Sequence, residues 1–195
     1  RDFQAWEYQP LGPFLAKNFL TTVSPWIVTS EALAPFRIAQ PQRPEGDPRP
    51  LPYLWSDRDQ VQGAYGLELT TALTTAAMRE AGEPAHVLGR GPASNMYWTL
   101  AQMVTHHASN GCNLNPGDLL GTGTISTPDD SGLGSLLELT RGGGQPITLP
   151  NGETRTFLQD GDELSIAGRA QAPGYVSIGF GPCTGMVTPA FVDVS

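Results

Sequence analysis

Hydrophobic and polar residues alternate over several short stretches of the chain, which is the spacing of β-strands. Tyr65, Leu67 and Leu69 alternate with small or polar residues and predict one strand. After Gly117, apolar stretches recur between turns that contain Asn-Gly, Asp-Gly or Gly-Gly-Gly, and they predict a further series of strands. These stretches are LLGTGTIS (119–126), GSLLELT (134–140), PITL (146–149), RTFL (155–158), DELSIAGRA (162–170) and GYVSIGFG (174–181).

One longer stretch has the spacing of a helix, because its apolar side chains recur every three or four residues. We expect this helix to begin at Ser94, whose hydroxyl can cap the first turn. We expect it to end at Asn110, because Gly111 can adopt the left-handed conformation. The residues that carry the spacing are Met96, Tyr97, Leu100, Ala101 and Val104.

The other segments are rich in residues that interrupt regular structure. Prolines divide residues 1–38 into extended chain and turns, with one short helix expected at residues 30–34, capped by Ser30. Residues 40–52 form a Pro-rich connector that need not pack and that we place on the surface. Residues 80–94 are typical of a turn region. The whole pattern predicts an α+β fold that is mainly β, with few helices.

Composition agrees with this fold class and excludes several kinds of partner. The 195 residues suffice for one large core or two modest ones, and 23 glycines and 18 prolines favour strands and turns. A net charge of −8 argues against nucleic acid, because a phosphate-binding face needs a basic stripe. No stretch approaches the roughly 18 apolar residues of a membrane span. Two cysteines are too few for a disulfide scaffold and fit a reducing compartment.

The first candidate for chemistry is Lys17, which lies in an otherwise apolar stretch. An ammonium group removed from water costs several kcal/mol unless an anion pairs with it. Either Lys17 extends to solvent, or it waits for an anion. Together with Arg1, Gln4, Tyr8 and Thr21 it forms a set that can bind a dianionic substrate or stabilise an oxyanion. The alternative is that these are scattered surface polar groups.

Thr124 and Glu138 are two further candidates. Thr124 lies in the glycine-rich GTGTIS, where the backbone can approach a ligand closely. The alternative is a glycine-rich turn, and the Lys-Ser/Thr ending of a phosphate-binding loop is missing. Glu138 lies in the expected strand GSLLELT, where its carboxylate can orient a histidine base. The alternative is an outward-facing glutamate of an alternating strand.

The histidines and cysteines argue against a zinc site. His106 and His107 are adjacent, so on a helix their side chains point about 100° apart and seldom bind one metal ion. We interpret one as a structural histidine with a hydrogen-bond partner and the other as exposed. Cys112 and Cys183 lack CxxC spacing. Oxygen ligands from aspartate, glutamate and threonine would suit Mg²⁺ or Ca²⁺ better.

Several long runs of residues form an ordered pattern. They are RDFQAWEYQPLGPFLAKNFLTTVSPW (1–26), RPLPYL (49–54), NMYWTLAQMVTHHASNGCNLNPGDLLGTGTIS (95–126), GSLLELT (134–140) and RTFLQDGDELSIAGRAQAPGYVSIGFGPC (155–183). These runs cover most of the chain and closely resemble the fumarylacetoacetase family. The resemblance implies the mixed β-sheet roll of the family's C-terminal domain.

The resemblance also implies an activity and its setting. The family hydrolyses a carbon–carbon bond of the diketo acid fumarylacetoacetate, giving fumarate and acetoacetate, in the last step of tyrosine and phenylalanine catabolism. A divalent cation, Mg²⁺ or Ca²⁺, chelates the diketone oxygens as a Lewis acid. A homodimer in the cytoplasm is implied as well.

Matching motifs assign roles to individual residues. Arg1, Gln4 and Lys17 would stabilise the carbanion-like leaving group, and Glu138 would orient the catalytic histidine. In this interpretation the apolar neighbours of Lys17 keep it out of water until an oxyanion pairs with it.

The binding residues follow from the same motifs. Gln4, Tyr8 and Thr124 would contact the substrate. Lys17, through its carbonyl, and Thr21 would lie at the metal site.

The chain also departs from the family pattern. Leu20 stands where the family has glycine before the threonine pair. The family's other metal carboxylates and its catalytic histidine lie upstream of the Arg-Asp motif, and His86, His106 and His107 do not match that histidine's motif. We therefore expect residues 1–195 to be the C-terminal part of the catalytic domain, without the family's N-terminal SH3-like domain and the start of the catalytic domain. We expect this part to be inactive alone.

Two other functions stay open at this point. One is a relative in the same superfamily that hydrolyses acylpyruvates, or that isomerises or decarboxylates a related keto acid. The other is a non-catalytic β module that binds carboxylates. Substrate choice would separate the enzymes, and indifference to replacement of Lys17 or Glu138 would indicate the binding module.

Overall fold

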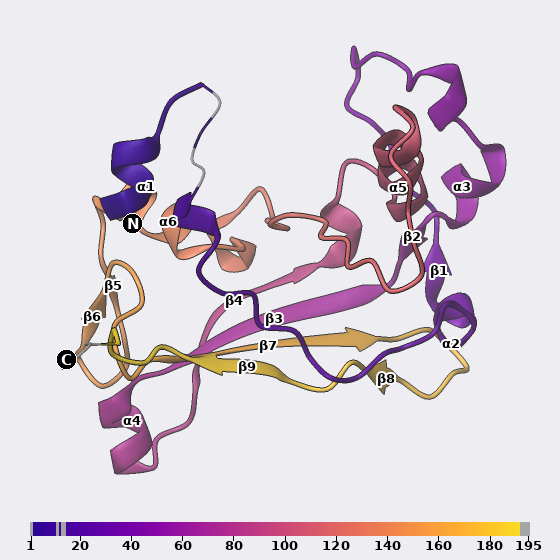
Figure 1. Ribbon diagram of the computed structural model, residues 1–195. Coiled ribbons are helices and arrows are strands. Elements are labelled where there is room, and N and C mark those ends of the chain that lie inside the picture. Colours follow the sequence, from indigo (N-terminus) through magenta and orange to yellow (C-terminus); the bar gives the residue numbers. More distant parts are fainter. Residues whose placement is uncertain (1, 11, 13–14, 192–195) are drawn as a thin grey trace.

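The computed structural model describes residues 2–10, 12 and 15–191. Its centre is a five-stranded antiparallel sheet in which β3 (Leu67–Thr74) and β7 (Glu163–Ala170) pair along their whole lengths (Figure 1). β4 (His86–Pro92) pairs with the other edge of β3. β8 (Ile178–Gly179) and β9 (Cys183–Met186) both pair with β7.

Two short ribbons complete the β structure of residues 2–10, 12 and 15–191. β1 (Arg37–Ile38) pairs with β2 (Ala64–Tyr65), and β5 (Ile147–Thr148) pairs with β6 (Thr154–Arg155). All strand pairings within the described ranges are antiparallel. The predicted class, α+β and mainly β, is confirmed.

In the described part of the chain, six short α-helices surround the sheet, and most begin at a serine or threonine whose hydroxyl accepts a hydrogen bond from the first turn. The capping residues are Thr29, Ser56, Thr75, Thr99 and Ser135. The helices are α1 (Asp2–Glu7), α2 (Ser30–Leu33), α3 (Asp57–Gln62), α4 (Ala76–Ala81), α5 (Leu100–Ala108) and α6 (Leu136–Leu139). Short 3-10 helices lie at Leu15–Lys17, Ala34–Phe36, Pro52–Leu54, Ala93–Asn95, Asp130–Gly132 and Arg141–Gly143.

A small hydrophobic core lies where the end of β3 meets α4 and the β5–β6 ribbon. Leu73, Met78 and Leu149 are almost completely buried there. Partly buried side chains of Leu88, Ile147 and Leu158 pack against them.

Directly beside this core lies a buried ion pair. The guanidinium of Arg155 donates to both carboxylate oxygens of Asp162, over 2.8 and 3.0 Å, and the Asp162 side chain is fully buried. Arg155 also pairs with Glu153 at 3.1 Å. Glu153 accepts a further hydrogen bond from the hydroxyl of Thr75, the cap of α4. This network ties the β5–β6 ribbon, the start of β7 and the start of α4 together.

Several sequence predictions hold and others are wrong. Strands form at β3, β5, β7 and β8, within stretches where alternation or turns predicted them, whereas β6 includes only Arg155 of the stretch predicted at 155–158. The expected strand at 119–126 is irregular, because glycines such as Gly123, with φ +77°, interrupt extended backbone. The expected strand at 134–140 is instead α6, since the Ser135 hydroxyl accepts from the backbone N–H of Glu138 and starts a helix.

The predicted turn region at 80–94 is a third error, because it contains β4. Its glycines are needed because residues 127–133 pass directly over this strand. A Cβ atom on Gly89 would lie 2.9 Å from the carbonyl oxygen of Leu133, and one on Gly91 would lie 2.9 Å from Cγ2 of Thr127. Close packing, and not a turn, explains these glycines.

The helix boundaries also differ from prediction. The long helix begins at Leu100, because Thr99 and Gln102 form a reciprocal capping box, whereas Ser94 lies in a 3-10 turn. Gly111 adopts the expected left-handed conformation, with φ +86°. Residues 30–33 form the predicted short helix, but Thr29 is its cap. An additional helix, α1, lies in the region predicted to be extended.

We predict that Asp162→Asn lowers the free energy of unfolding by about 3 kcal/mol, because the buried Arg155 loses its buried counter-charge and keeps only the partly exposed Glu153. The midpoint of urea denaturation measures this change. Asp130→Asn is the matched control, since it breaks the exposed Asp130–Arg141 pair, worth less than about 1 kcal/mol. Equal effects of the two substitutions would contradict the account.

A second prediction concerns acid stability. Hydrogen bonds from Thr75 and Asn151, and then Arg155, lower the pKa of Glu153 from 4.5 to about 2. Because the folded-state pKa is depressed, this stabilisation is complete above pH 4.5 and is lost as the pH falls toward 2. As the pH is lowered between these two values, the midpoint of urea denaturation should therefore fall less steeply for Glu153→Gln than for the unsubstituted protein. Glu80→Gln, on the exposed part of α4, should keep the original slope.

Candidate active site

The first group of candidate residues lies on α1 and the 3-10 helix that follows it. These two elements are joined where Oε2 of Glu7 accepts a hydrogen bond from the backbone N–H of Ala16 over 2.9 Å. Gln4 is half-buried on α1, and Tyr8, directly after α1, is 79% exposed. Arg1 lies outside the described residues.

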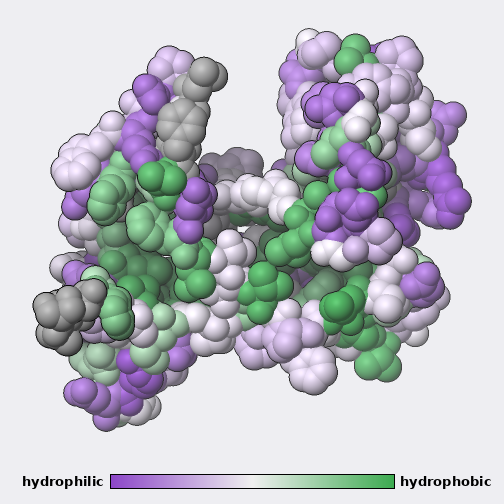
Figure 2. Space-filling view, in the orientation of Figure 1, coloured by the Kyte–Doolittle hydropathy of each residue, from purple (hydrophilic) through white to green (hydrophobic). Residues whose placement is uncertain are grey.

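Lys17 is the last residue of the 3-10 helix, and its side chain is exposed. The expectation that apolar neighbours keep it out of water is wrong for this chain. Those neighbours, including Leu15, Phe19 and Leu20, are themselves 68% to 82% exposed and so do not enclose it. Figure 2 shows that other apolar residues, in green, are also exposed on the face of the molecule that Figure 1 presents. The ammonium group is therefore available to a ligand.

The segment after Lys17 is fixed against the C-terminal strand. The thiol of Cys183 donates to the carbonyl oxygen of Thr22, and the hydroxyl of Ser24 donates to that of Phe180. Trp26 packs so closely on Gly181 that a Cβ atom there would lie 2.6 Å from the indole. These contacts place the exposed Thr21 beside β9.

The second group lies on the irregular segment 119–126 and on α6. The carboxylate of Glu138 is half-buried and accepts three hydrogen bonds from hydroxyls. Ser126 donates toward its two oxygens over 2.9 and 3.0 Å, and Ser135 donates to Oε2 over 2.7 Å. The backbone N–H of Gly134 donates to Ser126 in turn, which fixes its hydroxyl. This carboxylate is thus held in one orientation.

Thr124 belongs to the same group and is exposed. A Cβ atom on Gly134 would lie 2.7 Å from Cγ2 of Thr124 and 2.3 Å from the carbonyl oxygen of Ile125. The glycine before α6 therefore lets residues 124–126 approach Glu138.

Sequence reasoning missed Ser126 as a functional residue. Its only signal was its place at the end of GTGTIS, two residues after the candidate Thr124.

The structure thus brings the candidates together in two groups. Gln4, Tyr8 and Lys17 lie on one, and Thr124 and Glu138 lie on the other. In Figure 1, α1 and α6 are both drawn above the same end of the sheet. No hydrogen bond or ion pair joins the two groups within the described part of the chain.

The described residues do not form a metal site by themselves. No group of three or more His, Cys, Asp or Glu side chains gathers among them. Lys17 and Thr21, the expected metal neighbours, would offer only neutral oxygens. A Mg²⁺ or Ca²⁺ ion prefers several oxygens, carboxylates among them, so these residues alone do not fit one.

The histidines and cysteines occupy other places. Nδ1 of His106 lies 2.9 Å from the hydroxyl of Tyr53, and Nε2 of His107 lies 3.3 Å from Sγ of Cys112. Both histidines are exposed, so the expectation of one exposed histidine is only half right. Both cysteines are free. Among the described residues no helix is long and apolar enough to cross a membrane.

The fold and the polar groups define an α+β domain with a serine-held carboxylate and an exposed lysine. The sequence model described as Fumarylacetoacetate (FAA) hydrolase C-terminal matches residues 1–188. The chain therefore belongs to the fumarylacetoacetate hydrolase family.

Curated relatives agree with this assignment. Fumarylacetoacetase of Homo sapiens is 50% identical over 192 residues, which cover 98% of this chain and 43% of that protein. Fumarylacetoacetase of Arabidopsis thaliana is 49% identical over 190 residues, 97% of this chain and 42% of that protein. That of Dictyostelium discoideum is 45% identical over 192 residues, with 97% and 42% covered. The chain spans less than half the length of these relatives.

We predict that Ser126→Ala lowers the free energy of unfolding by about 1 kcal/mol, because a half-buried carboxylate loses one charge-assisted partner. Chemical denaturation measures the change. Ser109→Ala, at an exposed helix end, is the control and should change stability by less than about 0.5 kcal/mol. An unchanged stability of Ser126→Ala would show that this hydroxyl does not anchor Glu138.

Proposed function

We propose that the protein with this chain hydrolyses fumarylacetoacetate to fumarate and acetoacetate. The observation that carries the proposal is the identity of about half of all residues, over nearly the whole chain, with proteins named fumarylacetoacetase. The exposed ammonium of Lys17 and the fixed carboxylate of Glu138 support it.

The reaction indicates what these residues would do. Water adds to a carbonyl carbon, the adjacent carbon–carbon bond breaks, and its electron pair leaves with the acetoacetate part as an enolate. The enolate then takes a proton. Lys17 and Gln4, with Arg1, would stabilise the negative charge as it develops, since cations and amides aimed at such a charge lower the barrier. Tyr8 and Thr124 would position the substrate.

Glu138 would act as a positioning residue. In the family interpretation it orients a histidine that takes the proton from water. No histidine among the described residues hydrogen-bonds to Glu138, whose described partners are Ser126 and Ser135. The role of the serines would be to keep one carboxylate orientation.

The metal, the assembly and the location are proposals of the same kind. A Mg²⁺ or Ca²⁺ ion would supply Lewis acidity to the diketone, although the described residues do not form its site by themselves. A homodimer is supported by exposed apolar residues such as Phe19, Trp26 and Ile27, since such surfaces often mark interfaces. The two free cysteines are compatible with a cytoplasmic enzyme of tyrosine and phenylalanine catabolism.

The two alternative functions from the sequence analysis predict different experimental results. An acylpyruvate hydrolase, or an isomerase or decarboxylase of a related keto acid, would use the same groups on another substrate. A carboxylate-binding module would show no turnover and would be indifferent to replacement of Lys17 or Glu138.

We predict that Lys17→Met lowers kcat for fumarylacetoacetate at least about 100-fold, because it removes a cation that stabilises the developing charge. The assay uses the protein as its gene encodes it, with Mg²⁺ in the buffer. The fall in fumarylacetoacetate absorbance with time measures kcat. Lys17→Arg is the matched control and should retain part of the activity, because the charge remains.

Substrate choice completes the experiment. Faster cleavage of a simple acylpyruvate would assign the protein to the neighbouring enzyme. Turnover that is indifferent to Lys17→Met would exclude the proposed role of the lysine, and no turnover of either substrate would favour the binding module.

A further inference from the structure

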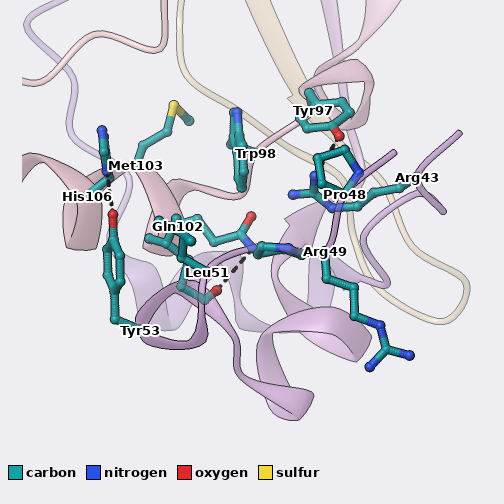
Figure 3. A pocket seen from close by; sticks show the side chains of 12 residues that line it. Arg43, Pro48, Arg49, Leu51, Tyr53, Tyr97, Trp98, Gln102, Met103 and His106 are labelled. Atoms are coloured by element: carbon teal, nitrogen blue, oxygen red, sulfur yellow. Dashed lines mark hydrogen bonds between the residues drawn. The ribbon is translucent and has the colours of Figure 1, made fainter. Parts of the chain in front are cut away.

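A cavity lies away from the candidate active site, between the Pro-rich connector and α5. It has a volume of about 430 Å³ (Figure 3). Its walls are mainly aromatic and aliphatic, which with this volume is typical of a small-molecule site. The side chains that matter most are Arg43, Leu51, Tyr53, Trp98, Met103 and His106.

The base of the cavity is rigid. The buried side chain of Gln102 donates to the carbonyl oxygen of Leu54 over 3.1 Å and accepts from the backbone N–H of Thr99 over 3.0 Å. Thr99 donates in turn to Asp59 on α3. Because the amide nitrogen and the amide oxygen of Gln102 both have hydrogen-bond partners, we assign this residue to the wall of the cavity and ligand recognition to other side chains.

One end of the cavity holds a fixed cation. The guanidinium of Arg43 lies 4.3 Å from the ring centroids of both Tyr97 and Trp98. It donates to the hydroxyl of Tyr97 over 2.6 Å, and that hydroxyl donates to Asp47. The side-chain amide of Gln40 donates hydrogen bonds to the backbone carbonyl oxygens of Met96 and Tyr97. The connector, predicted to need no packing, is thus docked on the start of α5.

Arg43 keeps donors for a ligand. Within the described residues no carboxylate lies within ion-pair distance of it, although the nearby Asp47 offsets part of its charge. The hydrogen bond to Asp47 also raises the pKa of Tyr97, so its hydroxyl stays protonated near neutral pH. A stacked guanidinium is suited to a planar carboxylate, because its remaining N–H groups point outward in one plane.

The opposite end of the cavity is closed by aromatic rings. Tyr53 and His106 stack at 18° and share a hydrogen bond of 2.9 Å. Figure 3 shows Trp98 and Met103 between this pair and Arg43. A ligand that follows these walls would meet apolar surface over most of its length and the cation at one end.

We infer that this cavity binds a small aromatic carboxylate, with its carboxylate on Arg43 and its ring between Trp98, Leu51 and Met103. The inference does not rest on the proposed hydrolase activity, because none of these residues belongs to the two candidate groups of that site. A cationic ligand would be repelled by Arg43, and a polyphosphate would need more cations than this end offers.

Two ligands of matched shape test the inference. Hydrocinnamate carries a carboxylate, and hydrocinnamyl alcohol presents the same ring and chain without charge. Isothermal titration calorimetry and saturation-transfer NMR measure their binding to the protein as its gene encodes it. Hydrocinnamate should bind at least about tenfold more tightly, since a charge-assisted bidentate contact is lost in the alcohol.

Two variants locate the contact. Arg43→Met keeps the apolar stem and should remove most of the preference for hydrocinnamate. Arg49→Met is the control in the same connector, because the guanidinium of Arg49 extends away from the cavity in Figure 3, and binding should change less than about twofold. Circular dichroism checks that both variants fold. Equal binding of both ligands, no binding of either, or a preference that survives Arg43→Met in the folded variant would each overturn the inference.

Discussion

The buried ion pair between Arg155 and Asp162 is the constraint on which the rest of the structure depends. Removing two charges from water is tolerable only when each is fully paired, so the elements that supply them have little freedom. Asp162 directly precedes β7, and Glu153 in the same network holds Thr75, which directly follows β3. Since β3 and β7 meet at Thr74 and Glu163, the network clamps the end of the central strand pair and fixes its register.

From this sheet the scaffold positions the candidate site in two ways. On one edge, the glycines of β4 let residues 127–133 pass close to the strand, and the chain then enters α6 with Glu138 oriented by serine hydroxyls. On the other side, residues 180–183, which lead into β9, contact residues 22–26, and the segment with Lys17 lies just before them. The side chain of Lys17 is exposed and therefore available to a ligand. The groups that surround its ammonium would then include those of the bound ligand.

Sequence pattern predicted the parts of this fold that depend on local chemistry. The alternation in β3 and β7, the left-handed Gly111 and the motifs around Lys17 and Glu138 were all visible in the sequence. The prediction was wrong for β4, because its glycines make room for residues 127–133, which pass over the strand. It was also wrong for α6, because the hydroxyl of Ser135 caps a helix within a stretch that has the spacing of a strand. The anchoring of Glu138 by Ser126 and the cavity beside Arg43 depend on tertiary contacts that spacing does not encode.

We propose that Lys17 faces the substrate of a carbon–carbon hydrolase. Because Lys17 is the only lysine within residues 1–195, peptide mass spectrometry after reductive methylation assigns any methylated lysine in this part of the protein to it. The experiment compares the methylation rate in the protein as its gene encodes it, with and without saturating fumarate and acetoacetate. The account predicts that these products slow methylation of Lys17 severalfold. An unchanged rate with bound products would contradict it.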